Sequence, residues 1–136
     1  MMKEIKEQPD VLSYALSNYL DFTEFEIKES KFDFDFSNVE RIIISACGTA
    51  YFAGMVAKYW LENIANIKVD LEIASEFRYK KMFFDEKSIS LFISQSGETA
   101  DTLAALKYAK QNKQRVVSIV NTEESSISNE SDLVLP

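Results

Sequence analysis

Four polar side chains and a glycine that together could hold an anion lie within residues 94–99 (SQSGET). This segment follows a short apolar run, 89–93, and precedes a helical pattern. Each serine or threonine hydroxyl donates one hydrogen bond and accepts two, and Gly97 permits a positive φ or a close approach of the backbone to a ligand. The first N–H groups of the following helix have no intrahelical partner and favour negative charge. The segment therefore predicts a phosphate site.

Helix capping is the simpler interpretation of the same segment. A Ser96 or Thr99 side chain that capped the helix would stabilise it by about 1 kcal/mol. Capping needs one such side chain, whereas this strand end concentrates four polar side chains and a glycine, so we favour a ligand. The segment has no lysine, so dipoles would offset most of the anion's charge. We expect the Glu98 side chain to point away from the anion.

A second polar turn, residues 47–49 (CGT), follows the β-branched run 41–45. In open parallel sheets, ligands bind beyond the carboxyl ends of the strands, near the point where the strand order reverses. We therefore expect Gly48 and Thr49 to lie near the first turn. Cys47 could be a reactive thiol if a helix N-terminus lowered its pKa, but a packed side chain is the interpretation we prefer.

Several common chemistries are excluded by the spacing and by the composition. The three glycines, Gly48, Gly54 and Gly97, match neither a P-loop nor a dinucleotide fingerprint. The run S-Q-S-G is not the G-x-S-x-G of a nucleophile elbow. Histidine is absent, which excludes a Ser-His-Asp triad, a Cys-His pair and a histidine zinc site within this chain. Any chemistry here would use carboxylates, lysines or tyrosines, or residues from elsewhere.

The elements that must position these turns alternate between strands and helices after residue 41. We expect strands at 41–45, 68–73, 89–93, 115–120 and 132–135. We expect helices at 50–63, 74–81 and 99–112, with about one helical turn within 121–131. Such alternation predicts right-handed crossovers and an α/β fold, a three-layer, doubly wound parallel sheet of about five strands with helices on both faces.

The N-terminal third of the chain is less regular. A helix is expected over residues 9–20, where Pro9 and Asp10 supply a start signal. Residues 21–37 alternate acids and phenylalanines. A strand and a connecting segment anchored by aromatic side chains are both compatible with its period-two part, Phe32, Phe34 and Phe36.

Two helices carry side chains that suggest contacts. The helix at 50–63 is apolar nearly all round, which predicts burial on two sides or a subunit interface, with Tyr59 and Trp60 as core or dimer contacts. The helix at 74–81 carries a mixed-charge group, for which a solvated face is preferred over a partner surface. That group consists of Glu76, Arg78, Tyr79, Lys80 and Lys81.

Composition limits the partners. The chain has 136 residues, a net charge of −7 and a pI near 4.7, which argues against nucleic acid and anionic membranes. No apolar run is long enough to span a bilayer, and the charged start lacks an apolar signal core. One cysteine excludes an internal disulfide and fits a reducing compartment, so a cytoplasmic location is expected. Neither a metal nor a cofactor is expected.

Five sequence segments resemble a known family, the sugar isomerase (SIS) domains, and most closely those of glucosamine-6-phosphate synthases. These segments are KEI-EQP (3–9), ACGTAYFAGMVAKYW (46–60), EIASEFRY (72–79), SQSGETADTLAAL (94–106) and ESDLVL (130–135). The resemblance runs over almost the whole chain and is weakest at 18–38. It implies a flavodoxin-like SIS fold preceded by an N-terminal helix.

The resemblance also implies roles for both turns. The first turn would bind the phosphate of fructose 6-phosphate or glucosamine 6-phosphate, with Gly97 shaping the loop and Gly48 and Thr49 beside the sugar. The implied phosphate contacts are Ser94, Gln95, Ser96 and Thr99. The sequence departs from the family at Ala50, where a ligand-contacting serine is usual, and at Phe52, where a polar residue is usual.

The resemblance finally implies what this chain lacks. Residues 1–37 would be a linker with a helical segment, and 38–136 the first SIS subdomain. The glutaminase domain and the second SIS subdomain, with the catalytic glutamate, histidine and lysine, would lie outside. The chain alone is thus expected to bind a hexose 6-phosphate without turnover, to pair with the remainder of the enzyme and to form a homodimer. The alternatives are a non-enzymatic SIS module that senses a sugar phosphate, and a scaffold whose loop only caps a helix.

Overall fold

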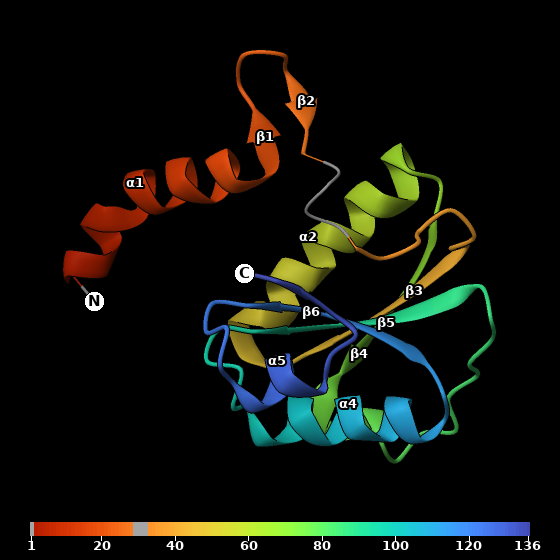
Figure 1. Cartoon of the computed structure of the whole chain (residues 1–136). Coiled ribbons are helices and arrows are strands. Elements are labelled where there is room, and N and C mark those ends of the chain that lie inside the picture. Colours follow the sequence, from red (N-terminus) through yellow and green to blue (C-terminus); the bar gives the residue numbers. More distant parts are fainter. Residues whose placement is uncertain (1, 29–32) are drawn as a thin grey trace. The chain divides into compact units, whose positions relative to one another are not determined.

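Five parallel strands form one sheet in the order β4-β3-β5-β6-β7 (Figure 1). The computed structural model describes residues 2–28 and 33–136, and the sheet belongs to the larger of two compact units, residues 36–136. The strands are β3 (Arg41–Ala46), β4 (Lys68–Ile73), β5 (Ser88–Ser94), β6 (Arg115–Val120) and β7 (Leu133–Leu135). The chain runs from β3 outward to β4 and then returns to the other side of β3, which confirms the expected doubly wound, flavodoxin-like order.

Helices cover both faces of this sheet, which gives the expected three layers (Figure 1). Helix α2 (Gly48–Ile64) packs on β3, β4 and β5 from one side. The other side carries α3 (Ala74–Phe77), α4 (Ala100–Gln111) and α5 (Ser126–Glu130). Because each crossover places the next helix at the carboxyl end of a strand, α2 and α4 both begin at the same edge of the sheet.

The main core lies between the sheet and α4, and strand alternation explains its membership. Ile43 of β3 and Phe92 of β5 are fully buried there with Leu106 of α4 and Phe77 of α3. The rings of Phe77 and Phe92 meet edge to face, with centroids 5.7 Å apart. This core fixes α4, and with it the turn that precedes α4.

Glycine lets α2 lie close to the opposite face of the sheet. A Cβ on Gly54 would lie 3.0 Å from Cδ1 of Leu71 and 3.1 Å from Cγ2 of Ile44. Gly54 is also the buried residue of this helix. The close approach places the first turn of α2, with Thr49, against the ends of β3 and β5.

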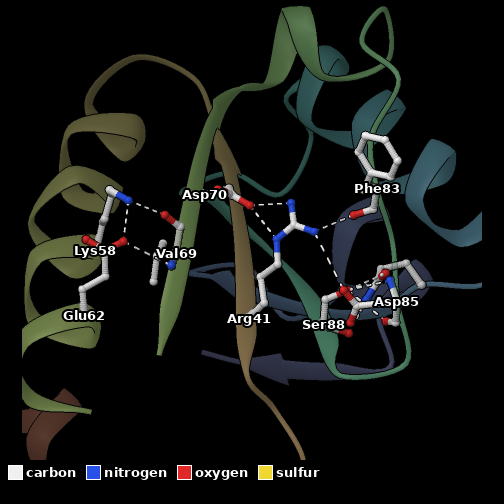
Figure 2. Close-up of polar contacts among 9 residues, drawn as sticks. Arg41, Lys58, Glu62, Val69, Asp70, Phe83, Asp85 and Ser88 are labelled. Carbon is white, nitrogen blue, oxygen red and sulfur yellow. Dashed lines mark hydrogen bonds and ion pairs between the residues drawn. The ribbon is translucent and has the colours of Figure 1, made fainter. Parts of the chain in front are cut away.

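Polar side chains fasten α2 to the edge strand β4 (Figure 2). The Nζ of Lys58 donates to Oε1 of Glu62 at 2.6 Å and to the backbone carbonyl oxygen of Val69. The backbone N–H of Val69 donates to the same Glu62 oxygen at 3.3 Å. One ion pair of α2 therefore serves both backbone groups of an edge residue, which are otherwise open to pairing with another strand.

A second polar group binds the loop before β5 to the amino end of the sheet (Figure 2). Arg41 donates from Nε to Oδ2 of Asp70 at 2.5 Å and from a terminal nitrogen to the carbonyl oxygen of Phe83 at 2.8 Å. That terminal nitrogen also lies 3.9 Å from Oδ2 of Asp85. These contacts lie at the amino ends of the strands, away from the two polar turns.

The smaller unit, residues 1–35, contains a helix that is longer than predicted. Helix α1 spans Met2–Tyr19, so it begins seven residues before the expected start and Pro9 lies inside it. The prediction failed because residues 2–8 are mostly strong helix formers, which outweigh the one backbone bond that Pro9 cannot donate. Among the described residues, no helix is long and apolar enough to cross a membrane.

A short hairpin follows α1 and was not predicted. It pairs β1 (Leu20–Asp21) with β2 (Glu26–Ile27) in antiparallel fashion. The Asp21 carboxylate accepts from the backbone N–H groups of Thr23 and Glu24 at 2.8 and 3.3 Å, which closes the turn. The described residues 33–37 form no strand, in agreement with a connecting segment, while Phe32 lies outside the described residues.

Helix α3 is shorter than predicted. It ends at Phe77, and the expected continuation to residue 81 is not helical. Lys80 pairs with Glu72 of β4, and the guanidinium of Arg78 lies 5.0 Å from the ring centroid of Tyr79. Both contacts are made by residues that follow the buried Phe77, where the chain is no longer helical.

Candidate functional site

The two polar turns lie side by side at the carboxyl ends of adjacent strands. Strands β3 and β5 pair in parallel, with Ala46 opposite Ile93. The next residues along the chain therefore start both turns at the same edge of the sheet, at the point where the strand order reverses. Gly48 and Gly97 have φ values of +58° and +67°, which other residues adopt rarely. Each turn thus uses its glycine to reverse the chain between strand and helix.

Hydroxyl groups hold the loop 94–99 in shape. The Oγ of Ser94 accepts from the backbone N–H of Gly97 at 3.1 Å and lies 3.0 Å from Oγ1 of Thr99. The Oγ of Ser96 accepts from the backbone N–H of Glu98 at 3.2 Å. Thr99 occupies the N-cap position of α4, yet its side chain makes no capping bond. Capping of α4 therefore does not account for these hydroxyls.

A cavity of about 380 Å³ opens beside the two turns. This volume falls within the range of about 300–1,000 Å³ that small-molecule sites occupy. Thr49, Ser94 and Gln95 line it, together with residues at the ends of β5 and β6. The remaining lining residues are Ala50, Ala53, Ile93, Ile119, Val120, Asn121 and Pro136. The cavity therefore combines a few polar groups with a set of apolar side chains, called its apolar floor below.

The other predicted site residues shape the turns without lining the cavity. Gly48, Ser96, Gly97 and Thr99 belong to the two turns but are not among the lining residues. Ala50 does line the cavity, so a methyl group stands where the resemblance implies a serine hydroxyl. Phe52 is 62% exposed and does not line the cavity.

Asn121 is a lining residue that the sequence reasoning missed. It directly follows β6, and its backbone N–H donates to the carbonyl oxygen of Gln95 at 3.3 Å. Its place in the sequence could have identified it, because a polar residue that directly follows the neighbouring parallel strand lies at the same edge of the sheet. The segment after β6 thus contributes a polar lining residue in addition to those of the two turns.

Glu98 is the charged residue of the loop, and its carboxylate is bound to α5. Its Oε1 accepts from the backbone N–H of Ser126 at 2.7 Å. This N–H, and secondarily the Ser126 hydroxyl, hold the pKa of Glu98 below its ordinary value of 4.5. The carboxylate is therefore ionised at neutral pH, and it accepts a hydrogen bond from the first residue of α5.

The structure also tests the predictions for Cys47, Tyr59 and Trp60. Cys47 is half-buried and packs against the main core, in agreement with the packing interpretation. Tyr59 and Trp60 are 66% and 58% exposed. Of the two predicted alternatives, this excludes core contacts, and a dimer contact stays a prediction. Both side chains point outward because α2 turns its other side, with Gly54, to the sheet.

Comparisons with known sequences point to one family. The sequence profile of the SIS domain matches residues 35–136. The chain is 53% identical over all its 136 residues to a glutamine–fructose-6-phosphate aminotransferase (isomerizing) of Brucella abortus. It is 50% identical over the same length to the enzyme of that name from Zymomonas mobilis. In both cases the chain spans 22% of the relative's length.

Comparisons with solved structures agree with this result. The C-terminal domain of a glucosamine-fructose-6-phosphate aminotransferase from Francisella tularensis superposes with a TM-score of 0.87 at 42% identity. That match covers 98% of this chain and 38% of the other. A glucosamine-6-phosphate deaminase from Thermotoga maritima gives a TM-score of 0.78 at 25% identity, covering 98% of this chain and 39% of the other.

Proposed function

This chain belongs to the SIS domain family, and we propose that it is the hexose-6-phosphate-binding subdomain of a glutamine-dependent fructose-6-phosphate aminotransferase. The ligand would be fructose 6-phosphate or glucosamine 6-phosphate. One observation carries the proposal. Thr49, Ser94 and Gln95, from two turns that are 45 residues apart, line a single cavity where the strand order reverses. The names of the relatives support this choice of ligand.

The phosphate would lie over the loop 94–99, before the first turn of α4. The hydroxyls of Ser94 and Thr99 now bond to each other, so one of the two protons is already used inside the loop. A phosphate oxygen would accept from both hydroxyls, because each can rotate its proton outward. The orphan N–H groups at the start of α4 add further donors. The described lining of the cavity includes no lysine or arginine, so neutral donors would carry most of the binding.

The sugar would extend from the phosphate along the apolar floor. Ala50 and Ala53 of α2 and Ile119 of β6 line this part of the cavity. Thr49 and Asn121 also line the cavity and would be hydroxyl and amide partners for sugar hydroxyls. A hydroxyl at position 50 is replaced by a methyl group, so we expect one hydrogen bond fewer than a serine would provide.

This chain would hold the substrate, and other parts of the enzyme would perform the reaction. Amination and isomerisation need proton transfer near neutral pH, for which histidine is the commonest side chain, and the sequence has none. The described cavity lining carries no titratable side chain. We therefore propose that the acid, base and amine groups come from the rest of a longer enzyme. A boundary between linker and SIS domain at residues 37 and 38, a homodimer and a cytoplasmic location belong to the same proposal.

Calorimetric titration tests the choice of ligand. The 136-residue chain should bind fructose 6-phosphate and glucosamine 6-phosphate more tightly than free fructose or inorganic phosphate, because only the sugar phosphates reach both the loop and the apolar floor. Equal affinity for fructose and its phosphate would contradict the phosphate site. Equal affinity for phosphate and the sugar phosphates would contradict the sugar site.

A further inference from the structure

Three hydrogen bonds join the loop 94–99, called the phosphate loop below, to the segment 121–127 that follows β6. In each bond the segment 121–127 donates a backbone N–H and the loop accepts. The pairs are Asn121 with the Gln95 carbonyl at 3.3 Å, Ile127 with the Gly97 carbonyl at 3.0 Å, and Ser126 with the Glu98 carboxylate at 2.7 Å. Two bonds use backbone acceptors that any sequence would supply. The third depends on the Glu98 side chain.

The same segment also packs tightly against the loop. A Cβ built on Gly97 would lie 1.9 Å from Oγ and 2.3 Å from Cβ of Ser125. Ser125 is 1% exposed, so it has no room to move outward. Glycine at position 97 is thus required twice, by its positive φ and by the side chain of Ser125.

Ser125 is itself held by the residues around it. Its Oγ accepts from the backbone N–H of Ser128 at 3.4 Å and lies 2.9 Å from Oγ of Ser128. The Ser128 hydroxyl in turn donates to the carbonyl oxygen of Thr122 at 3.0 Å. Internal hydrogen bonds therefore hold the segment 121–127 in place, and the loop 94–99 packs against it.

We propose that Glu98 and Ser125 are positioning residues that fix the phosphate loop in its binding shape through the segment 121–127. Neither residue lines the cavity. Glu98 links the loop to the start of α5, and Ser125 supplies the surface on which Gly97 rests. Binding is tighter when the bound shape exists before the ligand arrives. The loop's effect on a ligand rests on the proposed function, whereas the shape of the free loop does not.

Exposed glutamates in this region give a matched comparison. Glu98→Ala removes the acceptor, and Glu98→Gln keeps a carbonyl oxygen that can accept from Ser126. Glu124→Ala removes an equal charge from an exposed position in the segment itself. Amide hydrogen exchange by NMR on the ligand-free 136-residue chain, followed by titration with fructose 6-phosphate, gives two separate readouts.

Glu98→Ala should speed exchange of the Asn121, Ser126 and Ile127 amides about tenfold and weaken fructose 6-phosphate binding about tenfold. Glu98→Gln should restore much of both, and Glu124→Ala should leave both unchanged. The amides of β5 and β6 should keep their protection in every variant, which separates positioning from loss of the fold.

Faster exchange at Ser126 alone, with unchanged affinity, would overturn the positioning role while leaving the hexose phosphate site intact. Absence of binding by the wild-type chain would overturn the proposed function, and the exchange rates would still decide whether Glu98 fixes the loop. If Glu98→Ala does not fold, Glu98→Asp takes its place, because the shorter side chain draws the carboxylate back from the Ser126 N–H. Faster exchange at Asn121 and Ile127 in Glu98→Asp supports the role, and wild-type exchange there contradicts it.

Discussion

At the scale of single residues, Ser94 connects the fold to the proposed ligand. It ends β5, is 4% exposed, and places its hydroxyl within 3.1 Å of the Gly97 nitrogen and 3.0 Å of the Thr99 hydroxyl. Among the three hydroxyl-bearing residues of this loop, Ser94 is also the one that lines the cavity. One side chain therefore shapes the turn and, under the proposed function, would offer a donor to the phosphate.

Ser94→Ala should weaken binding of fructose 6-phosphate about tenfold or more. It leaves the Gly97 N–H without its acceptor, a loss that costs about 1–3 kcal/mol for a buried group, and it removes one donor to the ligand. Calorimetric titration measures the affinity. Ser126→Ala is the control, because that residue takes part in the loop contacts mainly through its backbone N–H. Equal affinities for the two variants would contradict the role of Ser94.

The Glu98 carboxylate should titrate at a lower pH than the ordinary value of 4.5 for glutamate. Because the Ser126 N–H lowers its pKa in the folded chain, the contact stabilises the fold above the unfolded pKa. It is lost as the pH falls through the folded pKa. The amide proton shift of Ser126, followed by NMR from pH 7 to pH 3, should therefore change with a midpoint below 4.5. A midpoint at or above 4.5 would contradict the contact.

Residue identities alone predicted the two turns but not the contacts between them and the rest of the chain. Small hydroxyls and glycine after an apolar run marked 47–49 and 94–99, since such residues reverse the chain and bind anions in many folds. The Glu98 contact joins residues 28 positions apart, and Asn121 reaches the cavity only through the register of β5 and β6. No local pattern contains that information.

At the scale of elements, the site depends on how closely α2 lies on the sheet. Gly54 permits that approach to Leu71 and Ile44, and the Lys58–Glu62 pair fastens the helix to β4 at Val69 (Figure 2). The first turn of α2 carries Thr49 and Ala50 into the cavity lining. The helix is thus a structural support for one wall of the cavity.

Gly54→Val should destabilise the fold by about 1–3 kcal/mol, as overpacking of a core usually does. The added methyl groups have no space between α2 and the sheet, because even a single Cβ would lie 3.0 Å from a neighbour. Urea unfolding followed by circular dichroism measures the change in free energy of unfolding. Met55→Val, at a 51% exposed position of the same helix, controls for the helix propensity of valine. A midpoint equal to that of this control would contradict the close packing.

Elements of the sheet were predictable, whereas the ends of several helices were not. The five strands are apolar runs bounded by polar turns, and each expected range lies within one or two residues of the observed strand. The start of α1 and the end of α3 depend on competition between helix propensity, Pro9 and side-chain contacts such as Lys80 with Glu72. The turn of the β1–β2 hairpin places Phe25 at a φ of +56°, which its residue type does not favour.

At the scale of the whole molecule, the chain corresponds to only part of the length of its relatives. It spans 22% of its curated relatives and 38% of the similar Francisella tularensis domain. Its acidic surface, with a net charge of −7, gives no electrostatic attraction for a sugar phosphate. Under the proposed function, hydrogen bonds at the two turns would therefore have to supply the affinity.

The 136-residue chain should show no turnover. Incubation with fructose 6-phosphate and either glutamine or ammonium should yield no glucosamine 6-phosphate above the buffer blank, because the described cavity lining holds no proton-transfer group. Product analysis by mass spectrometry detects the outcome. Turnover that persists in the purified chain would show that this chain carries catalytic groups of its own.

An amide NMR titration tests the central claim, binding of a hexose 6-phosphate at the two turns, most directly. Addition of fructose 6-phosphate or glucosamine 6-phosphate should shift the amides of residues 48–49, 94–99 and 121, and leave those of the β1–β2 hairpin in place. Free fructose at the same concentration should produce much smaller shifts. If residues 94–99 do not move with either sugar phosphate, or move equally with fructose, the proposed phosphate site is wrong.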